Sequence, residues 1–187
     1  MSQTEIVIAG FGGQGVLFAG QILAYAAMDS GRQVTWIPSY GPEMRGGTAN
    51  CTVIVSDEEI GSPLVLNPQA AVVLNLPSLD KYESLVRPGG VLVYNTSMID
   101  REARRQDLVA LPVPATEIAE GLGDKRLANV VLLGALVSRL PVLALSTLEE
   151  ALPNHLPARH RHLLQANILA LQEGAAVAEW ETETIGS

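Results

Sequence analysis

The chain has 187 residues, 48% of them hydrophobic and 4% aromatic, and its formal net charge is −8. That length suffices for one domain with a sizeable core, so we expect residues 1–187 to form a single domain. The negative charge argues against nucleic acid and anionic membranes as partners, because both attract positively charged proteins. The single cysteine, Cys51, excludes an internal disulfide. It also excludes an iron–sulfur cluster held by this chain alone, since such a cluster usually takes four thiolates.

Targeting and metal-binding signals are also missing from the sequence. Residues 1–31 contain no Lys or Arg, so the charged start of a signal peptide is absent. The longest apolar runs, such as residues 130–137, are too short to span a bilayer. No C-x-x-C or His-rich spacing indicates zinc. We therefore expect a cytoplasmic protein with no metal site of its own and no membrane partner.

Apolar runs separated by turn signals predict an alternation of strands and helices. The expected strands are residues 5–9, 33–37, 50–55, 69–74, 91–94 and 108–113, and the expected helices are residues 14–30, 77–86, 115–121, 128–140, 147–152 and 160–180. A composition dominated by Ala, Val and Leu suits buried parallel strands. We predict an α/β fold, Rossmann-like and doubly wound. Its mostly parallel sheet should carry helices on both faces, with extra helices at the C-terminal end.

Turn and capping residues give these elements their expected boundaries. Gly31 is expected just past the end of the first helix, where a left-handed residue is common. Pro38 is expected to end the second strand, and residues 56–59 are expected to form a hairpin turn. Ser146 is expected to cap a helix, with Glu149 completing a capping box.

A glycine-rich stretch, residues 10–15 with the sequence GFGGQG, lies between the first expected strand and the first expected helix. This is the GxGxxG spacing in the context that phosphate-binding loops require. Glycine permits a positive φ and close backbone approach, and a helix N-terminus presents unpaired N–H groups to an anion. The N–H groups of Gly12, Gly13, Gln14 and Gly15 are therefore candidate phosphate donors. The alternative is a tight strand–helix turn whose glycines serve packing alone.

The second expected strand lacks a residue that dinucleotide binding requires. A Rossmann dinucleotide site has Asp or Glu at this position to bind the ribose hydroxyls, but here the sequence reads Trp-Ile-Pro-Ser over residues 36–39. A stand-alone nucleotide-dependent dehydrogenase remains an alternative function, which would require tight NAD(P) binding. The missing carboxylate argues against it.

A second loop, residues 39–47 with the sequence SYGPEMRGG, follows that strand. Arg45 could provide a bidentate guanidinium for phosphate, and Ser39 could cap the loop or donate to a ligand. Arg45 could instead pair with Glu43 or contact a sister subunit. Tyr40 and Glu43 could lie at an interface or at the edge of an active site, or could form structural hydrogen bonds. A strand followed by a loop would bring both loops to the carboxyl edge of the sheet, where open α/β folds bind ligands.

Three motifs together resemble one family: GFGGQG at residues 10–15, SYGPEMRGGTANC at residues 39–51, and Asn129 leading VVLLGAL. The chain resembles the gamma subunit, or the equivalent fused domain, of the 2-oxoacid:ferredoxin oxidoreductases, from about Thr4 to about Leu140. The SYGPE-x-RGGTA pattern is more like the 2-oxoglutarate type than the pyruvate type, which tends to read S-x-G-x-E-R-R-G-A-P. The resemblance implies oxidative decarboxylation of a 2-oxoacid with coenzyme A, giving an acyl-CoA and CO₂ and passing electrons to ferredoxin.

The resemblance also implies that most of the chemistry lies on other chains. Thiamine diphosphate, Mg²⁺ and 4Fe–4S clusters are expected on alpha and beta partner subunits, and in some complexes on a ferredoxin-like delta subunit. The domain itself is expected to help form the coenzyme A site and the subunit interfaces, with Gly12, Gly13, Gln14, Gly15, Ser39 and Arg45 as the candidate binding residues. We expect no catalytic residue on this chain, and we expect it to be inactive alone. A purely structural subunit remains an alternative.

The remaining polar residues have simpler interpretations. Cys51 is expected to be a buried, inert thiol in a strand. Asn129 most simply caps or packs at the start of its helix, with an interface or ligand role as the alternative. His155, His160 and His162 are expected at the surface. The basic cluster at residues 101–105 is expected to be a solvated face with charge pairs at i,i+3 and i,i+4 spacing.

Overall fold

The computed structural model describes residues 3–40 and 47–185, and the side chains of residues 3–40 and 47–180. The strands are β1 (Gln3–Phe11), β2 (Gln33–Tyr40), β3 (Thr48–Ser56), β4 (Ala70–Val73), β5 (Val91–Asn95) and β6 (Val109–Val113). The helices are α1 (Val16–Asp29), α2 (Leu76–Tyr82), α3 (Ala115–Gly121), α4 (Ala128–Arg139), α5 (Leu145–His155) and α6 (Leu164–Ile185), with 3₁₀ turns η1 (Lys125–Leu127) and η2 (Ala158–Leu163). The predicted alternation of strands and helices is confirmed, with boundaries shifted by a few residues.

The six strands form one sheet in the order β2-β3-β1-β4-β5-β6. Strands β1, β4, β5 and β6 run parallel, and β3 is antiparallel to both β1 and β2. The predicted α/β fold with a mostly parallel sheet is therefore confirmed. It departs from the dinucleotide fold in one respect: β3 separates β1 from β2, whereas the first two strands of a Rossmann sheet are neighbours.

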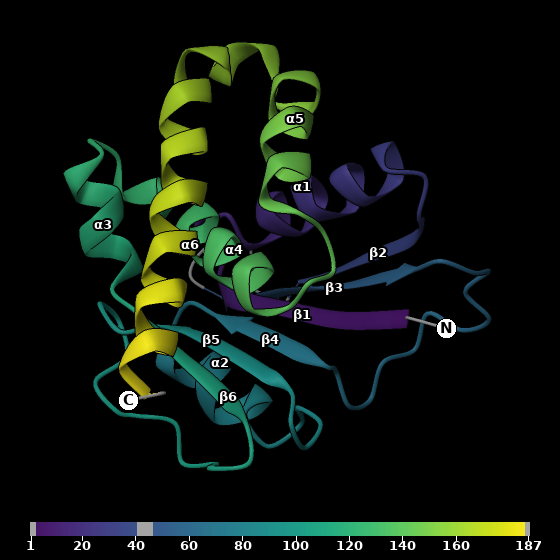
Figure 1. Cartoon of the computed structure of the whole chain (residues 1–187), viewed down its shortest axis with the longest axis vertical. Coiled ribbons are helices and arrows are strands. Elements are labelled where there is room, and N and C mark those ends of the chain that lie inside the picture. Colours follow the sequence, from purple (N-terminus) through teal and green to yellow (C-terminus); the bar gives the residue numbers. More distant parts are fainter. Residues whose placement is uncertain (1–2, 41–46, 186–187) are drawn as a thin grey trace.

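Helices cover both faces of the sheet, as predicted, but unequally (Figure 1). Ile6 and Ile8 of β1 join the larger core, which includes residues of α1, α4, α5 and α6. Val7 and Ala9 point to the opposite face and join a smaller core with α2. This alternation follows from the two-residue period of a strand. Because residues 6–10 of β1 are all buried, the carboxyl end of this strand is a rigid support for the loop that follows.

Helices α4 and α6 cross in direct backbone contact above the sheet (Figure 1). A Cβ atom on Gly134 of α4 would collide with the carbonyl oxygen of Leu171, and one on Gly174 of α6 would collide with that of Val131. Gly134, which lies inside the predicted helix 128–140, is therefore at a position where only a residue without a Cβ fits. The contact fixes α4, whose first turn adjoins the candidate site.

Three boundary predictions are wrong, each for a tertiary reason. Strand β2 continues through Pro38 to Tyr40, because an edge strand tolerates proline on the side that has no partner. Residues 56–59 form no hairpin, since β3 already pairs on both sides and residues 57–69 instead run as an irregular connection to β4. Helix α5 begins at Leu145, which packs against the core, so Ser146 lies inside the first turn and caps nothing.

The last predicted helix also begins differently. Residues 158–163 form the 3₁₀ turn η2, and the α-helix α6 starts only at Leu164. Among the described residues, every helix is too short or too polar to cross a bilayer.

The basic cluster at residues 101–105 is not a helical face with local charge pairs, so that prediction is also wrong. The segment is irregular and wraps around Glu83, which is 5% exposed. Glu83 accepts hydrogen bonds from the Arg101 side chain at 2.9 Å, from the backbone N–H of Arg105 at 3.1 Å and from that of Arg104. Burial alone would raise the pKa of Glu83, but these bonds outweigh it and lower the pKa. A buried carboxylate thus organises the segment.

Candidate functional site at the carboxyl edge of the sheet

The predicted convergence of the two loops at the carboxyl edge is seen at their described ends. The first loop follows β1, and the second lies between β2 and β3, which begins at Thr48. The N–H of Gly12 donates to the carbonyl of Gly47 at 2.9 Å. Residues 41–46, including Arg45 and Glu43, lie outside the described residues. The described part of the edge therefore consists of the glycine loop and the elements packed around it.

The backbone of the glycine loop needs glycine at two positions. Gly13 has φ 97° and Gly15, which precedes α1, has φ 73°. Both values lie in the left-handed region, where a Cβ atom introduces strain. A Cβ on Gly13 would meet no atom within 4 Å, so the space beside this residue is open. Gly13 thus combines an unusual backbone conformation with access to a ligand.

The four predicted N–H donors are not equivalent. Gly12 is occupied by Gly47, and Gln14 donates to the carbonyl of Phe11 at 3.2 Å. The Gln14 side chain is also engaged, because its Oε1 accepts from the N–H of Phe11 at 2.7 Å and from Asn75 Nδ2 at 3.2 Å. Within the described ranges, no acceptor faces the N–H of Gly13 or Gly15. Of the four predicted donors, these two are left for an anion at the start of α1.

Asn129 holds the glycine loop from the opposite side. This residue of the first turn of α4 is 3% exposed, and its Nδ2 donates to the carbonyl of Gly15 at 2.8 Å. A Cβ on Gly15 would collide with the Asn129 side chain. Asn129 therefore packs against the glycine loop, 114 positions away, while its Oδ1 is buried and has no hydrogen-bond partner among the described residues.

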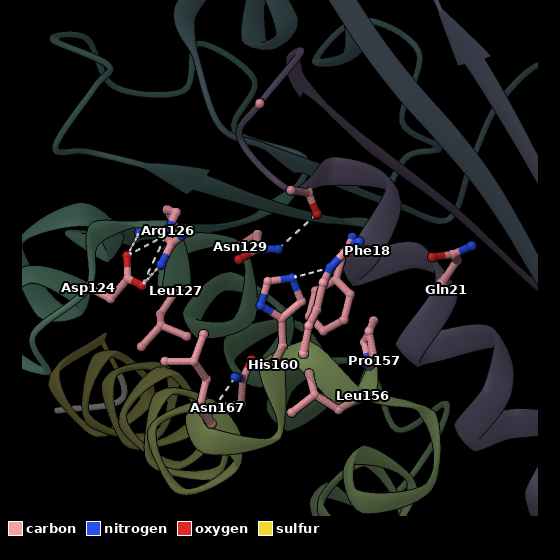
Figure 2. A pocket seen from close by; sticks show the side chains of 14 residues that line it. Phe18, Gln21, Asp124, Arg126, Leu127, Asn129, Leu156, Pro157, His160 and Asn167 are labelled. Atoms are coloured by element: carbon pink, nitrogen blue, oxygen red, sulfur yellow. Dashed lines mark hydrogen bonds and ion pairs between the residues drawn. The ribbon is translucent and has the colours of Figure 1, made fainter.

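A pocket of about 380 Å³ opens on one side of the glycine loop. Its lining comes from the loop, α1, η1, the first turn of α4, and the segment from the end of α5 into α6 (Figure 2). The lining residues are Gly13, Gly15, Phe18, Gln21, Asp124, Arg126, Leu127, Asn129, Leu156, Pro157, Arg159, His160, Leu163 and Asn167. We call this the α6 pocket.

A second pocket, of about 340 Å³, opens on the other side of Gly13, above the ends of β4 and β5. Its lining residues are Gly13, Gln14, Leu74, Asn95, Met98, Thr116, Glu120, Lys125, Arg126 and Ala128. We call this the β5 pocket. Asn95 closes it from below, with its side chain bonded to Thr116 Oγ1 at 2.9 Å and to the N–H of Ala115 at 3.1 Å. Gly13 and Arg126 line both pockets and mark the boundary between them.

Two positively charged side chains beside the glycine loop were not predicted from the sequence. Lys125 and Arg126 lie in η1 and are exposed at the β5 pocket. Arg126 forms a bidentate pair with Asp124, with distances of 2.9 and 2.6 Å. This bonding lowers the pKa of Asp124 and raises that of Arg126. Within the described part of the chain, Lys125 has no ion-pair partner. The sequence signal was the pair of basic residues between a Gly-Asp turn and an apolar helix.

Ser39 and Cys51 line neither of these two pockets. Ser39 is exposed on β2, opposite Asn50 of β3. Cys51 is fully buried, and burial raises the pKa of its thiol to about 12, so the inert thiol was correctly predicted. Among the described residues, no group of three or more His, Cys, Asp and Glu side chains is placed to hold a metal ion.

The three histidines do not share one environment. His162 is exposed, as predicted. His155 is half-buried, and its Nε2 lies 2.8 Å from Asp29 Oδ2 while its ring stacks on Tyr25. His160 is half-buried and lines the α6 pocket (Figure 2). His155 and His160 are thus partly rather than fully exposed; His155 contacts two residues of α1, and His160 accepts from the neighbouring Arg159.

Comparisons with known proteins all match this chain to proteins of one family. The family model described as pyruvate ferredoxin/flavodoxin oxidoreductase matches residues 5–177. The chain is 34% identical to the 2-oxoglutarate synthase subunit KorC of Methanocaldococcus jannaschii over 178 residues, which is 94% of each protein. It is 41% identical over 186 residues to the ketoisovalerate oxidoreductase subunit VorA of Methanothermobacter thermautotrophicus. That match covers 98% of this chain but only 37% of VorA. The chain thus spans about a third of some curated relatives and nearly the full length of others.

Solved structures give the same result. The keto/oxoacid ferredoxin oxidoreductase gamma subunit from Geobacter sulfurreducens superposes with a TM-score of 0.81 at 30% identity, covering 94% of this chain and 98% of that one. The 2-oxoglutarate:ferredoxin oxidoreductase from Magnetococcus marinus, solved with 2-oxoglutarate, coenzyme A and succinyl-CoA bound, superposes with a TM-score of 0.85 at 25% identity. That match covers 96% of this chain and 31% of that chain.

Proposed function

The chain belongs to the pyruvate ferredoxin/flavodoxin oxidoreductase family, and from that premise we propose that it is the gamma-type unit of a 2-oxoacid:ferredoxin oxidoreductase. Residues 1–187 would form one gamma-type domain of a complex whose reaction yields an acyl-CoA, CO₂ and reduced ferredoxin. The observation that carries the proposal is the family match over residues 5–177 together with the open glycine loop at the carboxyl edge of the sheet.

In this proposal the chain contributes to the coenzyme A site. Coenzyme A carries a pyrophosphate and a 3′-phosphate, which require N–H donors and cations. The N–H groups of Gly13 and Gly15 face no acceptor among the described residues, and Lys125 and Arg126 lie beside them. Arg45 and Ser39 remain proposed contributors from the second loop. The chain itself would bind and orient coenzyme A, and the bond-breaking steps would occur on partner subunits.

Those partners would be alpha and beta subunits, and in some assemblies a ferredoxin-like delta subunit, with ferredoxin as electron acceptor. Thiamine diphosphate, Mg²⁺ and 4Fe–4S clusters would be bound by the partners. The Magnetococcus marinus enzyme named above has coenzyme A and succinyl-CoA bound, which supports a coenzyme A role for the family. We propose that the complex acts in the cytoplasm.

For the substrate, we propose 2-oxoglutarate. The SYGPE-x-RGGTA pattern at residues 39–49 favours it, as does the match to KorC over 94% of both chains. Ketoisovalerate is the second candidate, because VorA is more similar in sequence, at 41% identity. A direct comparison of kcat/KM for the two oxoacids in the assembled complex would distinguish them.

An NAD-dependent dehydrogenase has less support. No acidic residue ends β2, and β3 separates β2 from the strand that carries the glycine loop. A ribose-binding carboxylate at the end of β2 would therefore lie two strands away from the loop that binds pyrophosphate.

The activity test uses co-expression. The purified chain alone should give no oxoacid-dependent viologen reduction, whereas co-expression with subunits that bear thiamine diphosphate and clusters should give coenzyme A-dependent reduction. Turnover by the isolated chain would contradict the proposal.

A second test separates coenzyme A binding from a purely structural role. Arg45→Ala and Lys125→Ala should each raise the KM for coenzyme A several-fold while the complex assembles normally. A structural subunit would show changed assembly, or an unchanged KM.

A further inference from the structure

The side chain of Gln14 has a fixed orientation within the glycine loop. Its Oε1 accepts from the N–H of Phe11 at 2.7 Å and from Asn75 Nδ2 at 3.2 Å. An amide side chain has one oxygen that accepts and one nitrogen that only donates, so two donors facing the oxygen determine which way round the amide lies. Gln14 is half-buried, and Asn75 is 2% exposed. The Gln14 oxygen therefore joins two buried parts of the molecule to the loop.

Gly10 leaves the space that the Gln14 side chain occupies. The φ of Gly10 is not positive, so its backbone conformation does not require glycine. A Cβ on Gly10 would lie 2.6 Å from Gln14 Oε1, its nearest neighbour. Gln14 could move away from that Cβ only by giving up its hydrogen bonds to Phe11 and Asn75. The first glycine of the GxGxxG spacing thus makes room for the glutamine.

The hydrogen bond between Gln14 and Asn75 spans the gap between β1 and β4. These strands are parallel neighbours, and the helices that follow them, α1 and α2, pack on opposite faces of the sheet (Figure 1). Doubly wound folds bind ligands in the crevice at such a point. Here the two amides bridge the crevice. Both pockets adjoin Gly13, and Asn75 lines neither, so the space for a ligand lies beside Gly13.

Asn75 is itself held in place, which makes it a firm anchor for the loop. Its Oδ1 accepts from the N–H of Ser78 at 3.0 Å and caps α2. Both ends of the Asn75 amide are therefore engaged, one with α2 and one with Gln14. A buried amide with all its partners rigidifies the elements that it joins.

We infer that Gln14 is a positioning residue whose side-chain oxygen holds the glycine loop, so that the N–H groups of Gly13 and Gly15 are presented to coenzyme A. Gln14 lies between these two left-handed glycines, so fixing its side chain fixes the backbone on either side. The inference rests on the proposed function and deepens it, because it names the residue that shapes the binding loop.

Two substitutions in the assembled complex test the role of the bridge. Gln14→Met keeps the length of the side chain but loses both hydrogen bonds, and should raise the KM for coenzyme A about tenfold, or about threefold for each bond. The kcat should not change, because the loop binds without taking part in bond breaking. Gln14 also lines the β5 pocket. Asn75→Ser leaves all of Gln14 in place, keeps a residue that caps helices and removes only the bridge, and should raise the KM about threefold.

A third substitution tests the link between Gly10 and Gln14. Gly10→Ala should displace the Gln14 side chain and raise the KM for coenzyme A about as much as Gln14→Met does. The double variant should then be no worse than either single variant by more than about twofold, because both changes break the same contacts. Effects that multiply in the double variant would overturn the link.

Hydrogen–deuterium exchange of residues 9–15, measured in the complex without coenzyme A, follows the loop directly. Exchange should become about tenfold faster in Gln14→Met. Gln165→Met is the matched control, because Gln165 is exposed on α6 and lines neither pocket; it should change neither exchange nor KM.

Unchanged exchange in Gln14→Met would overturn the positioning role. So would a fall in kcat at an unchanged KM, which is the result of partial unfolding alone. Faster exchange with kcat and KM both unchanged would uphold the hold of Gln14 on the loop and contradict the proposed function instead.

Discussion

Glycines at the α4–α6 contact and in the loop between β1 and α1 have opposite uses. At the contact, Gly134 and Gly174 have helical backbones, and each lies where a Cβ would collide with the facing helix. In the loop, Gly13 has a left-handed backbone and open space around it. Gly134 and Gly174 are needed because the facing helix leaves no room for a side chain. Gly13 is needed because its left-handed backbone conformation would strain a residue with a Cβ.

The difference separates positions that determine stability from those that determine binding. Close contact between α4 and α6 fixes α4, and Asn129 at the start of α4 bonds the glycine loop. The open space at Gly13 adjoins both pockets. Substitutions at the contact should therefore reduce stability throughout the molecule. Substitutions at the loop should weaken ligand binding more than they reduce stability.

The largest expected effect is at the helix contact. Gly134→Ala forces α4 and α6 apart, and should lower the free energy of unfolding by about 3 kcal/mol, the upper part of the range for overpacking. Chemical denaturation monitored by circular dichroism measures it. Gly121→Ala at the end of α3 is the control, because a Cβ there meets no atom within 4 Å. Equal stability of the two variants would contradict the close contact.

The buried carboxylate of Glu83 should contribute to stability through its charge and its hydrogen bonds. Glu83→Gln keeps one acceptor oxygen for the two backbone N–H groups, but it replaces the oxygen that accepts from Arg101 with an NH2 donor and removes the negative charge. It should lower the free energy of unfolding by about 2 kcal/mol near neutral pH. Because the pKa of Glu83 is lowered in the folded protein, its contribution is complete above the unfolded pKa and is lost as pH falls through the folded pKa.

The difference between wild type and Glu83→Gln should therefore shrink below about pH 4. Unfolding curves at pH 7 and at decreasing pH values measure it. Glu102→Gln, at an exposed residue of the same segment, should have little effect at any pH. A difference that grows on acidification would have the wrong sign.

Asn129 connects the two regions, so its substitution should affect both. Asn129→Ala removes the side-chain donor to the carbonyl of Gly15, which then keeps only the N–H of Ala19, and should cost about 1 kcal/mol of stability. It should also raise the KM for coenzyme A in the assembled complex, because the N–H of Gly15 is no longer held in place. Asn154→Ala, at an exposed residue of α5, should change neither quantity. A loss of stability with no change in KM would show that the loop does not need this support.

Much of the fold could be predicted because its signals are local. Apolar runs marked the six strands, and the GFGGQG sequence marked the turn into α1. The insertion of β3 between β1 and β2 could not be predicted, since strand pairing depends on contacts between distant segments. The wrong hairpin at residues 56–59 followed from the same limitation.

The candidate site was predictable only in part. Sequence spacing identified Gly13 and Gly15, but not that Gly12 and Gln14 use their N–H groups within the loop. Lys125 lies beside the loop only because η1 packs there. His160 lines the α6 pocket from η2, a separate element. Sites assembled from separate elements carry no single sequence signal.

The central claim is that the open glycine loop binds coenzyme A, and a comparison of two glycines tests it most directly. Gly13 and Gly123 have φ values of 97° and 95°, and a Cβ on either would meet no atom within 4 Å. Gly13→Ala and Gly123→Ala should therefore carry the same backbone strain, about 1 kcal/mol. Only Gly13 lines the two pockets. Measured in the assembled complex, the KM for coenzyme A should rise at least about fivefold in Gly13→Ala and stay unchanged in Gly123→Ala. The same KM in both variants would contradict the claim.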